Sequence, residues 1–97
     1  MASLWSNDFP MAINYYNRSL EIDPEFYHAY YDLGDTYLQN KQYDSAIENF
    51  NRFLKYYPSK YRLHNVIGDA YIALNDSVNA KKHYHIADSL KNILGKE

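Results

Sequence analysis

The chain has 97 residues, of which 46% are hydrophobic and 23% charged, with a formal net charge of −2 and no cysteine. This composition suits one small globular domain and excludes disulfides, thiolate metal sites and cysteine nucleophiles. The slightly acidic balance argues against a nucleic-acid partner, and no apolar run approaches the roughly 20 residues that cross a membrane. The N-terminus shows no secretory signal, so we expect a cytoplasmic protein with no membrane partner.

Apolar side chains spaced by three and four residues indicate helices along the whole chain, and no strand pattern appears. The expected helices cover residues 9–22, 25–39, 43–56, 60–73 and 77–93.

Start and stop signals accompany these helices. Asp8 precedes the first, and Asp23-Pro24 reads as an N-cap followed by a proline in the first turn of the second. Asn40 lies in a polar turn before the third helix, and Asn75-Asp76-Ser77 precedes the last. Gly95-Lys96-Glu97 then reads as a helix stop.

A seven-residue sequence motif occurs twice. YDLGDTY, residues 31–37, returns as NVIGDAY, residues 65–71, at an offset of 34 residues (68 − 34 = 34 for the two glycines). The same offset aligns Ala12, Ala46 and Ala80; Tyr16, Phe50 and Tyr84; Leu4, Leu38 and Ile72; and Pro24 with Pro58. A period held in several columns predicts internal repeats.

The repeated glycines predict a close contact between two helices. We expect Gly34 and Gly68 to leave room for the small Ala46 and Ala80 of the partner helix. A glycine inside a helix costs about 1 kcal/mol relative to alanine, so close packing must return more than that.

These residues resemble the tetratricopeptide repeat, a 34-residue helix-turn-helix. The second copy supplies Leu33-Gly34, Tyr37, Ala46, Phe50 and a closing Pro58, and the third supplies Ile67-Gly68, Tyr71, Ala80, Tyr84 and Ala87. A pentatricopeptide RNA binder would have a 35-residue period and a basic surface, which this chain lacks.

The resemblance implies an all-α fold, a right-handed α-solenoid of antiparallel helix hairpins with about five helices. A single domain would span residues 1–97, with a half repeat at 4–24 that holds only the second helix. Full repeats would follow at 25–58 and 59–94, the latter acting as the C-terminal cap.

The two ends of this array differ. Ala12 has no glycine partner in the first copy, so either the chain is an excerpt of a longer array or its N-terminal edge is a self-association surface. At the other end Asp88 replaces the leucine of the Leu20 and Leu54 column, and the last helix is polar, as a capping helix requires.

No group of residues predicts catalysis, a metal or a cofactor. His83 and His85 point about 200° apart on a helix, so they cannot share an ion and are expected on the surface. His28 and His64 lie on different helices without a third ligand at a recognisable spacing. No nucleophile elbow is present, and the three glycines form no phosphate-binding loop.

The first helix of each full repeat carries a second stripe beside its core face. In the tetratricopeptide family this stripe lines a concave groove that receives extended peptides or partner helices; here it consists of His28, Tyr31, Asp35, Arg62, Asn65 and Asp69. The expected function is a non-catalytic protein–protein interaction module. The alternatives are a structural module that oligomerises through its N-terminal edge, and a solvated helix face that binds nothing.

The stripe also predicts a polarised groove, whose ligand would have acidic and basic ends around an apolar or amide-bearing middle. Because neighbouring first helices run roughly parallel, His28 should lie beside Arg62 at one mouth and Asp35 beside Asp69 at the other. Some family members clamp the C-terminal carboxylate of heat-shock chaperones with lysine and asparagine, but Tyr31, Asp35 and Val66 occupy those positions here.

Overall fold

The structure is a computed structural model and describes residues 9–94. Leu4, Asp8 and Gly95-Lys96-Glu97, which the sequence assigned to a repeat column, a helix start and a helix stop, lie outside that range. Its helices are α2 (Phe9–Ile22), α3 (His28–Gln39), α4 (Tyr43–Tyr56), α5 (Tyr61–Ala73) and α6 (Ser77–Leu94).

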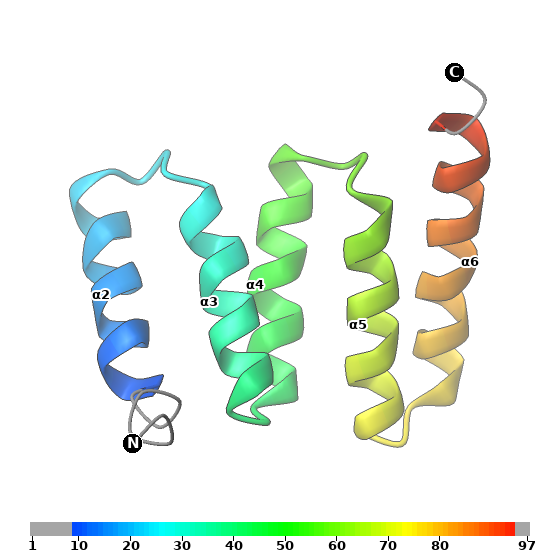
Figure 1. Cartoon of the computed structure of the whole chain (residues 1–97), viewed down its shortest axis with the longest axis horizontal. Helices are drawn as coiled ribbons and strands as arrows, with labels where there is room; N and C mark the ends of the chain where they lie inside the picture. Colours follow the sequence, from blue (N-terminus) through cyan, green and yellow to red (C-terminus); the bar gives the residue numbers. More distant parts are fainter. Residues whose placement is uncertain (1–8, 95–97) are drawn as a thin grey trace, which may run out of the picture.

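The helices stand side by side in chain order and alternate in direction (Figure 1). The hairpins α3–α4 and α5–α6 pack most extensively, and α2 and α4 also pack against the helix that follows each of them. The described residues form no strand. The expected all-α array of antiparallel helix hairpins is confirmed.

One predicted helix start is wrong. α3 begins at His28, and Asp23-Pro24 instead opens a turn before it. The Phe26 N–H donates to the Asp23 carbonyl oxygen at 3.0 Å, and the Glu25 N–H donates to Oδ1 of Asp23 at 3.1 Å. Aspartate and proline are favoured at the first two positions of a β-turn, so the same pair of residues suits a turn as well as a helix start.

The predicted start of the last helix is confirmed. Oδ1 of Asp76 accepts a hydrogen bond from the Asn79 N–H at 3.2 Å, the contact of a helix N-cap. Oδ2 of Asp76 accepts a second bond, at 2.7 Å, from the Asn79 side-chain amide. The side-chain bond and then the backbone bond hold the pKa of Asp76 below its usual range.

The 34-residue period extends to the backbone. Lys41 and Asn75, which follow α3 and α5, both adopt the left-handed conformation with φ of 62°. After each of them the chain turns back in the same way: the Gln42 N–H donates to the Tyr37 carbonyl at 2.9 Å and the Asp76 N–H to the Tyr71 carbonyl at 2.8 Å. The side-chain repeat therefore corresponds to a repeat of the turns.

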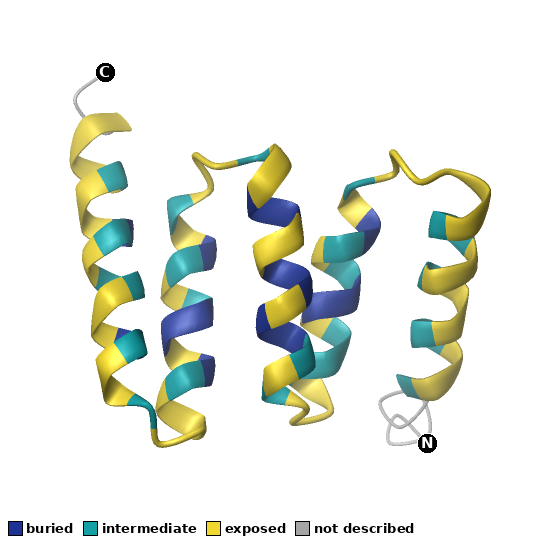
Figure 2. Ribbon diagram, turned by 180° about the vertical axis from the view of Figure 1, so that it is seen from behind, coloured by how far each residue is buried: buried dark blue, intermediate teal, exposed yellow. Residues whose placement is uncertain are grey.

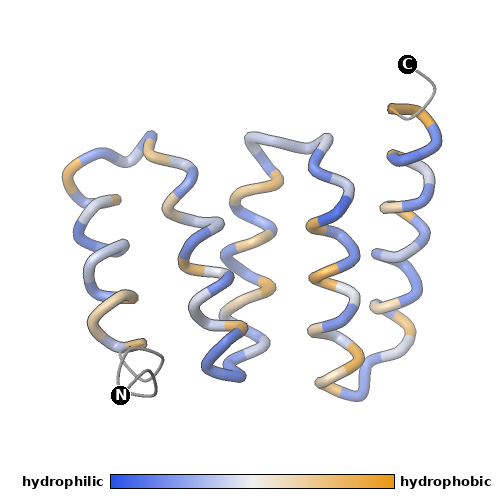
Figure 3. Tube along the Cα trace, viewed as in Figure 1, coloured by the Kyte–Doolittle hydropathy of each residue, from blue (hydrophilic) through white to orange (hydrophobic). Residues whose placement is uncertain are grey.

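The core lies between α4 and α5. Its buried cluster consists of Ala46, Ile47, Phe50, Phe53, Leu54, Leu63, Ile67 and Ala70. Figure 2 shows buried residues concentrated on α4 and on the sides of α3 and α5 that face it, while α2 has none. Figure 3 shows apolar residues recurring between polar ones along the helices, as the periodic pattern predicts.

Each helical glycine lies against an aromatic ring. A Cβ atom at Gly34 would lie 2.5 Å from Cδ1 of Phe50, and one at Gly68 would lie 2.6 Å from Cε1 of Tyr84. We expected the glycines to make room for Ala46 and Ala80, but the nearest atoms belong to the ring four residues further along. The glycine and aromatic columns of the repeat are therefore one contact, repeated in both hairpins.

Candidate functional site

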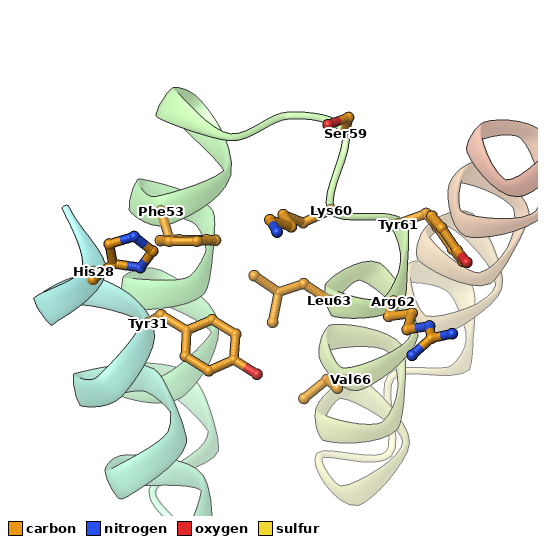
Figure 4. A pocket seen from close by; sticks show the side chains of 9 residues that line it. All are labelled: His28, Tyr31, Phe53, Ser59, Lys60, Tyr61, Arg62, Leu63 and Val66. Carbon is orange, nitrogen blue, oxygen red and sulfur yellow. The ribbon is translucent and has the colours of Figure 1, made fainter. Parts of the chain in front are cut away.

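All six residues of the predicted binding stripe are exposed on α3 and α5. Three of them, His28, Tyr31 and Arg62, line one pocket between α3, α4 and the start of α5 (Figure 4). The pocket has a volume of about 610 Å³, which lies within the usual range for binding pockets. Asp35, Asn65 and Asp69 do not line it.

The pocket includes residues that the sequence did not assign to a site. These are Phe53, Ser59, Lys60, Tyr61, Leu63 and Val66. Phe53 is 2% exposed and Leu63 4%, so both belong to the core and also form the pocket's apolar floor. Lys60 comes from the turn between α4 and α5, and its side chain extends across the gap toward Phe53 (Figure 4). No sequence signal marked that lysine, because its place depends on how the turn packs.

Stacked aromatic rings form the wall on the α3–α4 side. Tyr31 meets the ring of Phe53 edge-on, with ring centroids 5.3 Å apart. His28 stacks on Tyr57 at 5.4 Å, and Phe53 stacks on Tyr57 at 4.7 Å. Offset and edge-on pairs of this kind stabilise by about 0.5–1.5 kcal/mol beyond area burial, so the wall is held in place before any ligand arrives.

The pocket lining contains cations and no carboxylate. Lys60 and Arg62 line it, and in the part of the chain that the structure describes neither forms an ion pair with Asp or Glu. The Arg62 guanidinium lies over the ring of Tyr61, 5.9 Å from its centroid. The pocket therefore combines an apolar floor with the amine of Lys60, while the Arg62 guanidinium points away from the gap (Figure 4).

The two predicted groove aspartates have separate partners. Oδ2 of Asp35 accepts a hydrogen bond from the Gln39 side-chain amide at 2.9 Å, within α3. Oδ1 of Asp69 accepts one from the Tyr84 hydroxyl of α6 at 2.5 Å. That bond is the main cause of the raised pKa of Tyr84. Asp69 thus joins the helices of its own hairpin, although the sequence suggested no structural use for it.

Two histidines meet between α5 and α6. The Nδ1 atoms of His64 and His83 lie 3.0 Å apart, and the ring of Tyr71 stacks on His83 with a centroid distance of 5.5 Å. His83 is half-buried, so the expectation of a surface position is wrong for it, whereas His85 is exposed as expected. The sequence missed the pair because the two residues are 19 positions apart.

Burial lowers the pKa of both histidines. For His83, the charges of His64 and Lys82 lower the pKa further. A neutral pair can share one N–H between the two Nδ1 atoms, whereas two imidazolium rings would repel one another. No group of three or more metal-ligating side chains occurs among residues 9–94.

A family model described as tetratricopeptide repeat matches residues 15–48. These residues are similar to a tetratricopeptide repeat. The matched segment runs from α2 through α3 into α4, and it includes His28, Tyr31 and Asp35 of the predicted stripe. The resemblance that the glycine, alanine and aromatic columns predicted is confirmed.

The similarity in fold to solved structures covers nearly the whole chain. Two crystal structures of a protein named MamA are similar to it, each with 25% sequence identity. The first has a TM-score of 0.87 and covers 99% of this chain, and the second has a TM-score of 0.85 and covers 98%. The chain spans about half the length of these structures, 56% and 52%. No curated protein sequence matches it.

The tetratricopeptide repeat and the likeness in fold indicate a protein–protein interaction module, because members of this family typically bind protein partners and are generally not catalysts. Among residues 9–94, no helix is both long enough and apolar enough to span a membrane.

Proposed function

We propose that this chain is a non-catalytic module that binds a peptide or partner helix, with the pocket of His28, Tyr31 and Arg62 as its main contact. In this proposal the binding surface joins two full repeats, residues 25–58 and 59–94, which follow a half repeat at 4–24. Asp35, Asn65 and Asp69 extend the same surface along α3 and α5.

The observation that carries the proposal is the pocket itself. It is lined from α3, α4 and α5, and its floor is already buried among core residues. Tyr31 stands at its edge with 43% of its surface exposed and its ring held against Phe53. A rigid, amphipathic aromatic residue beside an apolar pocket is typical of an interaction hot spot.

Selection of short peptides from a random displayed library tests this proposal. Peptides selected on the wild-type chain are expected to lose affinity for Tyr31→Ala by about tenfold or more, because hot-spot aromatic residues contribute on the order of 2 kcal/mol. Their dissociation constants are measured by fluorescence polarisation with synthetic copies.

Tyr15→Ala is the matched control, since Tyr15 is a more exposed tyrosine, at 65%, on α2. It is expected to leave binding unchanged. Selected peptides that bind Tyr31→Ala as tightly as the wild-type chain would contradict the proposal.

The exposed face of α2 supports a second candidate, self-association through the N-terminal edge. Met11, Tyr15 and Ile22 are 66%, 65% and 85% exposed. They line a shallow depression of about 400 Å³ together with Asn14, Arg18 and Ser19. Apolar residues grouped on one helix face commonly mark a contact surface.

This second candidate predicts that the mean mass in solution rises with protein concentration. Light scattering on the wild-type chain measures that mass, and Met11→Asp with Ile22→Asp should return the chain to a monomer by placing charges in the contact. Val78→Asp, at a 77% exposed valine on α6, is the control that should not change the mass. A monomer at every concentration would rule this candidate out.

A further inference from the structure

We infer that the pocket between α3, α4 and α5 takes a peptide segment in which a large apolar side chain stands next to a carboxylate. The inference rests on the proposed function, and it names the chemistry of the partner. It refines the polarised groove that the stripe alone predicted, whose acidic end at Asp35 and Asp69 lies outside this pocket.

The apolar part of the ligand follows from the floor and walls. Phe53, Leu63 and Val66 provide aromatic and aliphatic contacts from two helices, and Tyr31 faces Leu63 and Val66 across the gap (Figure 4). A volume of about 610 Å³ exceeds that of any single side chain, so a large side chain fits together with part of its backbone. Transfer of such a side chain from water into the pocket stabilises binding.

The anionic part follows from the charges. Lys60 lines the pocket and extends into the gap, His28 lines the opposite side, and no Asp or Glu is among the lining residues (Figure 4). Arg62 also lines the pocket, with its guanidinium turned toward Tyr61. Lys60 and Arg62 are free of ion pairs with the described carboxylates. A ligand carboxylate would compensate this charge, whereas a basic segment would be repelled.

The carboxylates of α3 are not among the residues that line the pocket. Asp32 and Asp35 both raise the pKa of Tyr16 on α2, after the larger effect of burial. Burial raises the pKa of Asp32, and the charge of His28 opposes this effect.

The apolar floor and the amine of Lys60 belong to the same pocket. Lys60 extends into the gap toward Phe53 (Figure 4), so its amine and the apolar floor border the same pocket. A carboxylate that reaches this amine must therefore lie within one or two residues of the side chain that fills the floor. The chaperone clamp of the family uses lysine and asparagine at the positions of Tyr31, Asp35 and Val66, none of which is a cation here, although Tyr31 and Val66 line this pocket.

The test uses the peptides selected on the wild-type chain. We expect them to contain Asp, Glu or a free C-terminal carboxylate within two residues of Trp, Phe, Leu or Met. Lys60→Gln with Arg62→Gln should weaken their binding by about tenfold or more, because charge-assisted contacts are lost. Replacing the peptide's acid by its amide should weaken binding to the wild-type chain similarly. Raising the salt concentration should weaken the binding of the acidic peptide to the wild-type chain.

Lys55→Gln with Lys91→Gln is the matched control, because it removes the same charge at exposed positions outside the pocket. It should leave affinity within about twofold, since distant surface charges are screened. Circular dichroism establishes that both double variants keep the helical fold.

The outcomes separate this inference from the proposed function. Selected peptides without an acid, or with equal affinity for Lys60→Gln with Arg62→Gln, overturn the inference; if Tyr31→Ala still weakens them, the proposed function stands. Peptides that bind all the pocket variants as tightly as the wild-type chain overturn both. A selection that enriches no peptide above the support matrix also overturns both.

Discussion

Gly34→Ala should destabilise the chain, although alanine is the better helix former by about 1 kcal/mol. The new Cβ would lie 2.5 Å from Cδ1 and 2.6 Å from Cε1 of Phe50, closer than side-chain atoms approach one another. Phe50 is 1% exposed and cannot swing away, so we expect overpacking of about 1–3 kcal/mol to exceed the gain in helix propensity. Urea denaturation measures the free energy of unfolding.

Gly68→Ala is the matched comparison, because its Cβ would meet the ring of Tyr84 at 2.6 Å in the next hairpin. Tyr84 is half-buried and can move, at the loss of its hydrogen bond to Asp69, so the cost should be smaller. Phe50→Leu should reduce the cost of Gly34→Ala, because it removes the ring that the Cβ meets. Strictly additive free energies in this double-mutant cycle would show that the two residues do not touch.

Acidification should destabilise the α5–α6 hairpin through His64 and His83. The pKa of each is lowered in the folded chain, so the unfolded chain takes up protons first as the pH falls below about 6.5. The stability that the neutral pair contributes is present above pH 6.5 and is lost as the pH falls through the lowered pKa values. Thermal melts at a series of pH values between 8 and 5 follow this loss.

His64→Gln with His83→Gln should remove this dependence of stability on pH, because glutamine carries no charge at any of these pH values. His85→Gln, at an exposed position of the same helix, should retain it. Asp76 acts in a separate window, since its lowered pKa contributes stability that is lost only below about pH 4. Equal pH profiles for the wild-type chain and the double variant would contradict a role for the histidine pair.

The pocket shows how much of the candidate site could be predicted from the sequence. The stripe residues His28, Tyr31 and Arg62 could be predicted to lie on exposed helix faces, because helical spacing places them beside the core residues. Phe53 and Lys60 could not be added, since one reads as core and the other as an ordinary turn residue. Their shared position depends on how α5 packs against α4.

Asp23-Pro24 and Asp76 show the same limit at helix starts. Both aspartates precede a predicted helix, yet Asp76 caps α6 and Asp23 opens a turn. The five residues between α2 and α3 must reverse the chain before α3 can begin, and the turn uses the aspartate and proline for that purpose.

The sequence by itself determined the helices, the 34-residue period and the all-α array, because these depend on spacing within a single segment or on comparison of one segment with another. The tertiary structure alone decided which side chains meet between helices. Gly34 with Phe50, Asp69 with Tyr84, and His64 with His83 are contacts between separate helices, set by the angle and depth of packing. Helical periodicity shows which face of a helix turns inward, but it does not show which residue of the neighbouring helix lies opposite.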